Sequence, residues 1–370
     1  MTKNADEKPS SGKDQAGKRL YVAGVIEVPK APPYDKDDDA GLQSHNMSGL
    51  FCPPDADWCL MVADELRGVH RLKVDRDGKR PKVSYDAALQ LVLPSAVFLD
   101  EHGLDEKHLK ELDLEGVADV GDDVIFVGSH ANKRNGGEVN LGAHLVAIAD
   151  KKTLRTNVRI PPRWTSLDEL FKVKLPGRLN QQLQCGGVNI EGATVFNGKL
   201  MIGLRSPTQG AADEQKPGAY VISTPLEGLL EEDFSGAELH VLPTGDRFIG
   251  IRSMETIGDT ILLVTGDAGV NDLRDDQVPE CGSNLNKEDD RRPFQLRAWK
   301  PKNGNEMVRR ILFEFPEKKD NKDTRDGPQK RSRAKVEGIA LADRKGNDVS
   351  LFVVYDGRDE VFFLPDVKLP

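Results

Sequence analysis

The chain of 370 residues lacks any apolar run near the 18 residues that a membrane-spanning helix requires. Its first 18 residues, MTKNADEKPSSGKDQAGK, are charged and contain no apolar core segment, so they do not resemble a secretory signal. We therefore expect residues 1–18 to be a disordered leader and residues 19–370 to form one domain. The same absences predict a cytoplasmic protein that does not associate with membranes.

The sequence motifs typical of nucleotide-binding proteins and of serine hydrolases are also missing. There is no phosphate-binding loop of the Walker type, no dinucleotide-binding glycine motif after a strand, and no Gly-x-Ser-x-Gly elbow. The net charge of −9 argues against nucleic acid as a partner, because binding to phosphates needs a basic surface. Cys52 and Cys59 flank a turn, whereas Cys185 and Cys281 stand alone, so no zinc-type spacing occurs. We expect reduced thiols, as is usual in the cytosol.

The sequence does contain an internal repeat, supported by 35 glycines and 22 prolines that suit many short strands. Each copy has an apolar residue, a polar slot, usually Gly, a short strand, a turn, and a second strand that ends in polar residues. The copies begin at Asn46, Asp113, Asn189, Gly250 and Lys335. The polar slot holds Glu in three copies, as in DLEGVADVGDDVIFVGSHA and NIEGATVFNGKLMIGLRSP, but Ser48 in the first and Arg252 in the fourth.

Each copy is typical of two antiparallel strands joined by a tight turn, and the chain between copies could form two more strands. Four strands per unit, at a spacing of roughly 60 to 85 residues, predict an all-β, five-bladed β-propeller. The last copy lacks its fourth strand, which residues 20–28 (LYVAGVIEV) would supply, so that the N-terminal strand closes the last blade. The alternatives are a propeller of six blades and a β-sandwich in which the Glu-Gly pairs are coincidental.

The polar slots should gather at one mouth of the central channel, because the first strand of every blade lines that channel. In an antiparallel pair the start of the first strand lies beside the end of the second. We therefore expect Glu115 near Ser129 and His130, and Glu191 near Arg205. Long connections open at the same mouth, which marks it as the functional face: residues 131–141, 207–218, 268–293 and 317–335.

Three glutamates that converge on a narrow channel repel one another, so some take up protons or a cation lies among them. Oxygen ligands suit a hard ion such as Ca²⁺, or else Mg²⁺, and no Cys/His group competes for a softer metal. Alternatively, each Glu caps backbone amides without any metal. Arg252 could itself neutralise the carboxylates if it points inward, whereas a register slip of one residue would point Ser253 inward instead.

These residues resemble a known metal site. The succession Ser, Glu, Glu, Ser, Glu is similar to the central calcium site of the calcium-activated nucleotidases (apyrases), which are five-bladed propellers, and implies these metal ligands here: Ser48, Glu115, Glu191, Ser253 and Glu337. LMVADELRGVH, residues 60–70, resembles their Asp-Asp-Arg-Thr-Gly run, although a leucine is inserted before Arg67. FVGSH and MIGLRS resemble stretches of their second and third blades. The starts of the repeats resemble more directly a bacterial family labelled domain of unknown function 3616 and, more loosely, the esterase-like phytase propellers.

The resemblance implies a metal-dependent hydrolase that acts on a phosphorylated or other anionic small molecule. The ion would polarise a phosphoryl oxygen, with arginines stabilising charge and acidic groups moving protons. The implied catalytic residues are Asp64, Glu65, Arg67, His130 and Arg205. The residues expected to bind substrate are Ser129, Lys133, Asp267 and Asp356.

The rival hypothesis is a non-catalytic propeller with a structural ion at its axis. Its loop-rich face would bind a protein or a carbohydrate. The catalytic residues also have structural interpretations. Arg205 could simply pair with Glu191, and His130 could form a hydrogen bond to a loop. The two hypotheses therefore share the fold and differ in what the polar mouth does.

Overall fold

The computed structural model describes most of the chain. The described residues are 19–26, 47–63, 68–109, 112–132, 139–179, 181–182, 185–209, 217–246, 248–269, 293–308, 310–316, 318–319 and 333–370. The predicted leader, residues 1–18, lies outside them.

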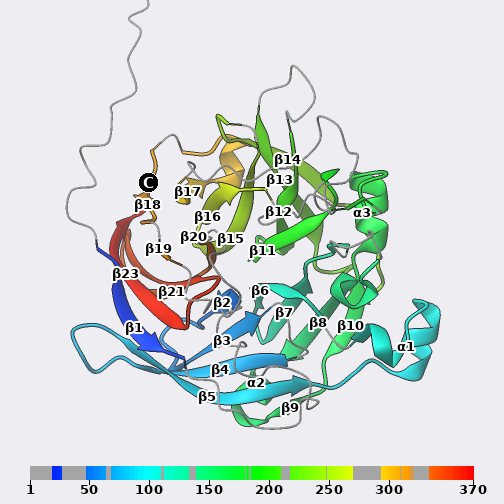
Figure 1. Ribbon diagram of the computed structural model, residues 1–370, viewed down its shortest axis with the longest axis horizontal. Coiled ribbons are helices and arrows are strands. Elements are labelled where there is room, and N and C mark those ends of the chain that lie inside the picture. Colours follow the sequence, from blue (N-terminus) through cyan, green and yellow to red (C-terminus); the bar gives the residue numbers. More distant parts are fainter. Residues whose placement is uncertain are drawn as a thin grey trace, which may run out of the picture.

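Five sheets, antiparallel except for one short added strand in blade one, are arranged in a ring and form a five-bladed β-propeller, which confirms the predicted fold (Figure 1). Blade one contains β2 (Met47–Phe51), β3 (Trp58–Ala63), β4 (Gly68–Asp75) and β5 (Lys82–Leu91), to which the short β9 (Arg159–Ile160) adds in parallel. Blade two contains β6 (Leu114–Val120), β7 (Asp123–Gly128), β8 (Leu145–Asp150) and β10 (Arg163–Ser166). Blade three contains β11 (Asn189–Phe196), β12 (Lys199–Gln209), β13 (Gly218–Pro225) and β14 (Glu238–Pro243).

Blade four contains β15 (Ile249–Ile257), β16 (Thr260–Asp267), β17 (Gln295–Trp299) and β18 (Phe313–Glu314). Blade five contains β21 (Val336–Lys345), β22 (Asp348–Tyr355), β23 (Glu360–Lys368) and β1 (Tyr21–Val25). A separate short pair is formed by β19 (Lys318–Lys319) and β20 (Arg333–Ala334). The helices are α1 (Ala96–Glu101), α2 (Lys151–Thr156) and α3 (Asp168–Lys174), with 3-10 turns η2 (Glu106–Leu109), η3 (Leu141–His144) and η7 (Pro301–Asn303). Among the described helices, none is long and apolar enough to cross a membrane.

The first strand of each blade is an inner strand, and the five inner strands contact one another in ring order. The Glu-Gly start of the repeat is explained by this crowding. A Cβ atom on Gly116 would lie 2.6 Å from the Cβ of Ala193 in the next blade, and one on Gly192 would lie 2.8 Å from Met254 Cγ. Only glycine lets adjacent inner strands approach so closely.

The turn inside the third repeat shows how local sequence sets the register. Phe196 pairs with Lys199, so Asn197 and Gly198 form a two-residue hairpin loop. Both have positive φ, +50° and +73°, which is the conformation of a type I′ turn and favours Asn-Gly. The twist of this turn matches that of the strands that it joins.

The N-terminal strand closes the ring as predicted, because β1 pairs with β23 at the outer edge of blade five. Its other side contacts blade one, where a Cβ atom on Gly24 would lie only 1.8 Å from the carbonyl oxygen of Val83. Ala23 and Ile26 are buried between the two blades. Blade five therefore combines chain from both ends of the protein.

The apolar core is divided among the blade interfaces. The buried apolar side chains of the described residues form five clusters, and each cluster lies between two adjacent blades. No blade can therefore bury its faces without both neighbours. This mutual dependence holds the five sheets together in one ring.

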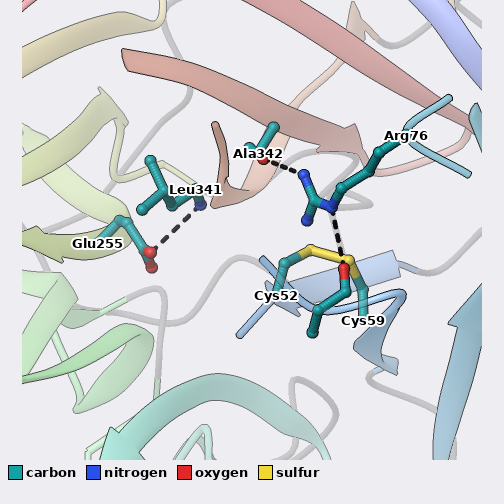
Figure 2. The surroundings of a disulfide bond; sticks show 7 residues. Cys52, Cys59, Arg76, Glu255, Leu341 and Ala342 are labelled. Atoms are coloured by element: carbon teal, nitrogen blue, oxygen red, sulfur yellow. Dashed lines mark hydrogen bonds between the residues drawn. A yellow bond between two sulfur atoms is a disulfide. The ribbon is translucent and has the colours of Figure 1, made fainter. Parts of the chain in front are cut away.

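The cysteines correct one expectation. Cys52 and Cys59 form a disulfide across the turn between β2 and β3, with their Cα atoms 4.2 Å apart, and Cys185 is also disulfide-bonded. Arg76 links this turn to blade five, since its guanidinium donates to the carbonyl oxygens of Ala56 and Ala342 (Figure 2). The prediction of reduced thiols is wrong because the tight turn brings the two sulfur atoms of blade one together.

Candidate functional site

A β-bulge recurs at the same place in all five inner strands and explains how the polar slots are presented. The pairing of each inner strand with its neighbour skips one residue where the slot falls. The skipped residues are Ser48, Glu115, Glu191, Arg252 and Glu337. A bulged residue leaves the ladder and its side chain is re-aimed. The slots of the repeat are therefore equivalent in the structure as well as in the sequence.

Arg252 lies at the centre of an ionic cluster, between the strands that carry Glu191 and Glu337. Its Nε lies 2.8 Å from Glu191 Oε2, and its Nη2 donates to Glu337 Oε1. The Arg252 side chain is 1% exposed, and both carboxylates are buried. Arg252, and not Ser253, is therefore the bulged residue whose side chain meets the carboxylates of the neighbouring blades. The prediction that Ser253 is an axial ligand is corrected, because its Oγ instead accepts a hydrogen bond from the backbone N–H of Ile339 at 3.1 Å.

Arg205 is the second cation of the cluster. Its Nη1 donates to Glu191 Oε1 at 2.8 Å, and its Nη2 donates to the carbonyl oxygen of Gly269. The Arg205 side chain is buried and comes from β12, next to the inner strand of blade three. Both oxygens of Glu191 thus contact an arginine. The expected proximity of Glu191 and Arg205 is confirmed, in the form of an ion pair.

The electrostatics of the cluster reflect its burial. Burial opposes the charge on Arg252, but the negative charges of Glu191, Glu337 and Glu115 outweigh it and raise the pKa of Arg252. Burial also raises the pKa of Glu337, and Arg252 offsets this only in part because Glu191 and Asp356 add repulsion. Two carboxylates thus contact the buried guanidinium group of Arg252, and burial favours a proton on Glu337.

The residues present fit an axial metal ion poorly. A hard cation needs several free oxygen ligands, yet Glu191 is engaged at both oxygens and Glu337 at Oε1. Glu337 Oε2 is buried and has no hydrogen-bond partner, and Glu191 Oε2, which also lacks one, lies 2.8 Å from Arg252 Nε. In the part of the chain that the structure describes, no three His, Cys, Asp or Glu side chains are arranged to hold a metal ion. Calcium or magnesium at the axis therefore stays a prediction.

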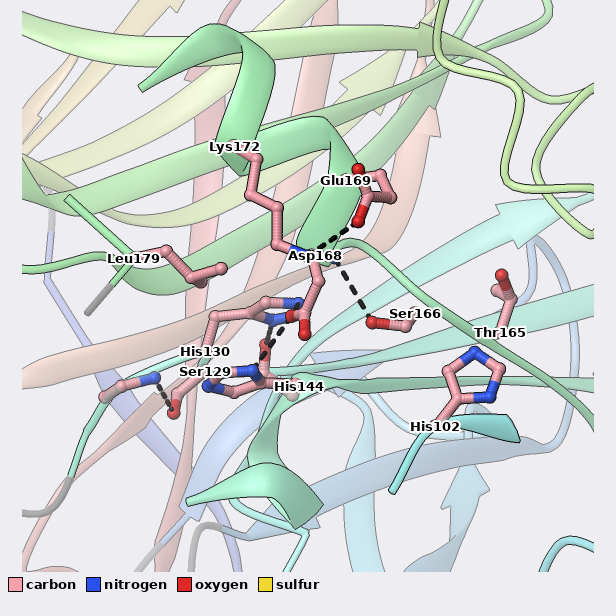
Figure 3. Close-up of polar contacts among 12 residues, drawn as sticks. His102, Ser129, His130, His144, Thr165, Ser166, Asp168, Glu169, Lys172 and Leu179 are labelled. Atoms are coloured by element: carbon pink, nitrogen blue, oxygen red, sulfur yellow. Dashed lines mark hydrogen bonds and ion pairs between the residues drawn. The ribbon is translucent and has the colours of Figure 1, made fainter. Parts of the chain in front are cut away.

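A second polar cluster lies at the outer part of blade two and includes His130 (Figure 3). His144 Nδ1 lies 2.8 Å from Asp168 Oδ1, and His130 Nε2 lies 3.9 Å from the same oxygen. The two imidazole rings are stacked, with centroids 4.9 Å apart and planes 5° from parallel. Because a metal lies in the plane of each ring that binds it, these two parallel rings cannot share one ion.

Burial and the neighbouring His144 lower the pKa of His130 to about 3, so its imidazole is neutral at physiological pH. Burial opposes the charge on Asp168, but His144 outweighs it and lowers the pKa of this carboxyl. The His130 side chain is fully buried, with Phe171 of α3 against its ring. The predicted role of His130 as a catalytic acid has no observation that tests it.

The substrate-binding predictions fall in different places. Ser129 is fully buried and its hydroxyl donates to Asp113. Asp267 is buried, and its Oδ1 accepts a hydrogen bond from Gly269 N at 2.7 Å, beside the carbonyl that Arg205 binds. Asp356 follows β22, and its N–H donates to the carbonyl of Lys335. Four predicted residues lie outside the described residues: Asp64, Glu65, Arg67 and Lys133.

Two members of the blade-two cluster, His144 and Asp168, were not predicted from the sequence. Neither belongs to the repeated strand pair, which was the pattern that guided the search. A weak signal was present, because Ser-Leu-Asp-Glu-Leu at residues 166–170 has acidic residues ahead of an apolar pair, as a helix start does. That signal would have predicted α3 but not its contact with the histidines.

The fold and cluster together define a five-bladed propeller whose axial carboxylates are neutralised by buried arginines. Residues 46–161 match the family described as Protein of unknown function (DUF3616). The predicted resemblance to that family is thereby confirmed over blade one and most of blade two. No curated protein matches the chain.

Solved structures with a similar arrangement are distant in sequence. The WD40 domain of Neurospora crassa Pan2 is 10% identical with a TM-score of 0.40, over 94% of this chain and 95% of that one. The mannose phosphorylase MPT-4 from Leishmania mexicana is 12% identical with a TM-score of 0.40, over 96% and 95%. An auxiliary nutrient binding protein from Bacteroides thetaiotaomicron is 12% identical with a TM-score of 0.37, over 95% and 77%. At these TM-scores the likenesses carry no argument about the fold or the activity of this chain.

Proposed function

We propose that this chain is a non-catalytic propeller that binds a protein partner at its loop-rich mouth, with the ionic cluster bracing the blades. The observation that carries this proposal is the position of Arg252, 1% exposed and in contact with both Glu191 and Glu337. Carboxylates engaged in this way are not available to hold a catalytic metal or to activate water. They stabilise the approach of three inner strands instead.

A protein partner suits the mouth better than a carbohydrate. Aromatic rings offer flat apolar surfaces for ligands, yet all three tryptophans serve packing. Trp58 and Trp299 are buried, and Trp164 donates its indole N–H to the carbonyl of Val92 at 3.2 Å. The connections that the sequence predicts at this mouth, residues 268–293 and 317–335, carry charges of both signs. Such charges favour the complementary surface of another protein.

The hydrolase hypothesis stays a prediction. Its proposed acidic residues and Arg67 lie outside the described residues, and Arg205 forms the ion pair that was its structural alternative. Burial of Ser129 and His130 gives no added support to a role at the substrate.

A turnover assay separates the two functions. Purified protein is incubated with Ca²⁺ or Mg²⁺ and a panel of phosphomonoesters, nucleotides and phytate. We expect no turnover above the background of Asp64→Ala. Turnover that is lost in Asp64→Ala but kept in Val97→Ala, a variant at a residue 67% exposed on α1, would overturn the proposal.

The binding function has its own test, which is capture of a partner by wild type and by variants in which one connection is replaced by a Gly-Ser linker. The replaced segments are residues 210–216 and, separately, 320–332. We expect one protein to bind wild type directly after purification and to lose affinity at least about tenfold in one variant. Binding that is unaffected by both replacements would argue against this mouth as the interface.

The cellular compartment is also a proposal. The cytoplasmic prediction depends on the first 18 residues, whereas disulfides persist mainly in oxidising compartments. Because Cys52, Cys59 and Cys185 are all disulfide-bonded, we propose that the chain matures in an oxidising compartment. Alkylation of protein trapped in acid directly from cells should find these thiols blocked. Full labelling without reductant would contradict this placement.

A further inference from the structure

Glu232 joins three segments of the chain at the outer edge of blade two. Its Oε1 lies 2.9 Å from His102 Nε2. The same oxygen accepts hydrogen bonds from the backbone N–H of Ser166 at 3.1 Å and from Thr165 Oγ1 at 3.4 Å. His102 follows α1, and Thr165 and Ser166 end β10, the outermost strand of blade two (Figure 3). Glu232 belongs to the connection between β13 and β14 of blade three, residues 226–237, so its carboxylate holds two separate connections against one strand.

The imidazole of His102 has a hydrogen-bond acceptor at each of its two ring nitrogens. Nδ1 lies 3.0 Å from the carbonyl oxygen of Phe98, and Nε2 lies 2.9 Å from Glu232 Oε1, which already accepts the N–H of Ser166. A neutral imidazole carries one N–H and an imidazolium carries two, whereas a carbonyl oxygen and an ionised carboxylate can only accept. Both hydrogen bonds can therefore form only when His102 is protonated.

The charges around this pair favour the protonated imidazole. Burial lowers the pKa of His102, but its two hydrogen bonds and the negative charges of Glu232 and Glu101 outweigh burial and raise the pKa above its ordinary value of 6.5. From the side of α3, Lys172 interacts with the charge of Glu232, and its Nζ pairs with Glu169 at 2.6 Å. An imidazolium at His102 thus compensates the carboxylate of Glu232 near neutral pH.

The backbone at Glu232 is strained, so its conformation depends on the contacts of its side chain. Its φ is +55°, in the left-handed region that glutamate rarely adopts. Such a conformation persists only where the surrounding structure holds it. On the other side of the contact, none of the six residues of α1 is buried, so apolar packing alone holds this helix weakly. Loss of the His102–Glu232 contact should therefore loosen both segments.

We propose that His102 and Glu232 form a pH-sensitive clasp, which holds α1 and residues 226–237 on the outer strand of blade two while the imidazole is protonated and loosens them when it is neutral. The pKa of His102 is higher in the folded chain than in the unfolded one. The clasp is therefore complete below pH 6.5 and weakens as the pH rises through the pKa of the folded state. This device goes beyond partner binding, which the proposed function places at the loop-rich mouth.

The first test titrates the imidazole directly, by NMR of protein whose histidines carry ¹³C at Cε1. The signal that is lost in His102→Gln belongs to His102, and we expect it to titrate above pH 6.5. Glu232→Gln keeps the shape of the side chain without its charge and should lower the pKa of His102. His108→Gln is the matched control, because His108 Nδ1 accepts the N–H of Asp105 at 3.1 Å and so needs no added proton. It should leave the titration of His102 unchanged.

The second test measures the loosening, by hydrogen exchange of peptides that cover residues 96–104 and 226–237 at pH 6 and pH 8.5, corrected for the intrinsic exchange rate. In wild type, protection should fall at least about tenfold between the two pH values. Glu232→Gln and His102→Gln should each be poorly protected at both, so the result does not depend on one variant. A titration of His102 at or below pH 6.5, equal protection of wild type at both pH values, or the wild-type pH dependence in both variants would overturn the clasp.

Discussion

His70 is buried on β4 of blade one, and neither of its ring nitrogens has a hydrogen-bond partner. Its cross-strand neighbour is Met61, and the ring of Tyr85 lies 5.9 Å away. Burial lowers the pKa of His70 to about 4, because no nearby acceptor compensates for the loss of water around a charged imidazole. The folded state therefore favours the neutral imidazole of His70 over the protonated one.

We predict that His70→Leu makes the protein more resistant to acid. The unfolded chain binds a proton at His70 below its ordinary pKa of 6.5, whereas the folded chain does so only near 4, so the folded state loses up to about 3 kcal/mol as pH falls through this window. Because leucine does not titrate, His70→Leu should not lose this part of its folding stability as the pH falls. Urea unfolding at pH 5 and pH 8 should place it above wild type at pH 5, with a smaller difference at pH 8.

Met61→Leu is the matched control, because it repacks the same site without a titrating group. It should keep the pH dependence of wild type. If His70→Leu and wild type lose stability in parallel between pH 8 and pH 5, the imidazole of His70 is not a source of acid sensitivity.

At the residue scale, the sequence predicted which residues occupy the axial positions but not the direction in which each side chain points. The repeat placed Glu191, Arg252 and Glu337 in equivalent slots, and the pairing of Glu191 with Arg205 followed from antiparallel strands. Whether Arg252 or Ser253 points inward depends on a single bulged residue between Ile251 and Ser253. A bulge of one residue reverses the direction of a side chain and leaves no mark in the alternation of apolar residues.

At the scale of elements, the closing strand β1 depends on one close backbone contact. Gly24 lies at an irregularity in the pairing of β1 with β23 and packs against the backbone of Val83 in blade one. The exposed edge of β1 is thereby covered by the neighbouring blade at this point. Unpaired edges are otherwise sites of association, so this contact also protects the fold.

We predict that Gly24→Ala destabilises the protein by about 2 kcal/mol or more, because the new methyl group would overlap the carbonyl oxygen of Val83 and force the blades apart. Val22→Ala in the same strand is the control, since Val22 is 58% exposed and should cost about 0.5 kcal/mol or less. Urea unfolding measures both. Equal effects of the two substitutions would mean that β1 does not pack closely on blade one.

The elements outside the repeat were those the sequence could not place. The strand pairs were predictable because alternating apolar residues and Gly or Asn turns recur in five copies. The helices α2 and α3 span only six and seven residues, too short for a helical period to stand out. The disulfide of Cys52 and Cys59 was missed because the prediction of a reducing compartment outweighed their place on either side of a turn.

At the scale of the whole molecule, stability is shared around the ring. Each apolar cluster belongs to two blades, and the ionic cluster joins blades three, four and five at the axis. Opening the ring at any interface exposes one cluster and uncovers the two sheet faces that packed against each other there. The interface between blades five and one is distinctive because the N-terminal strand contributes to it.

We predict that deletion of residues 1–26 lowers the melting temperature on the order of 10 °C, because blade five loses its outer strand and the apolar cluster around Ile26 opens to water. Deletion of residues 1–18 is the control and should leave the temperature unchanged, since β1 begins at Tyr21. A synthetic peptide of residues 19–26, added at millimolar concentration to the longer deletion, should restore part of the lost stability by pairing with β23. If both deletions melt with the full chain, or if the peptide rescues no better than a scrambled one, closure by the N-terminal strand does not hold the ring together.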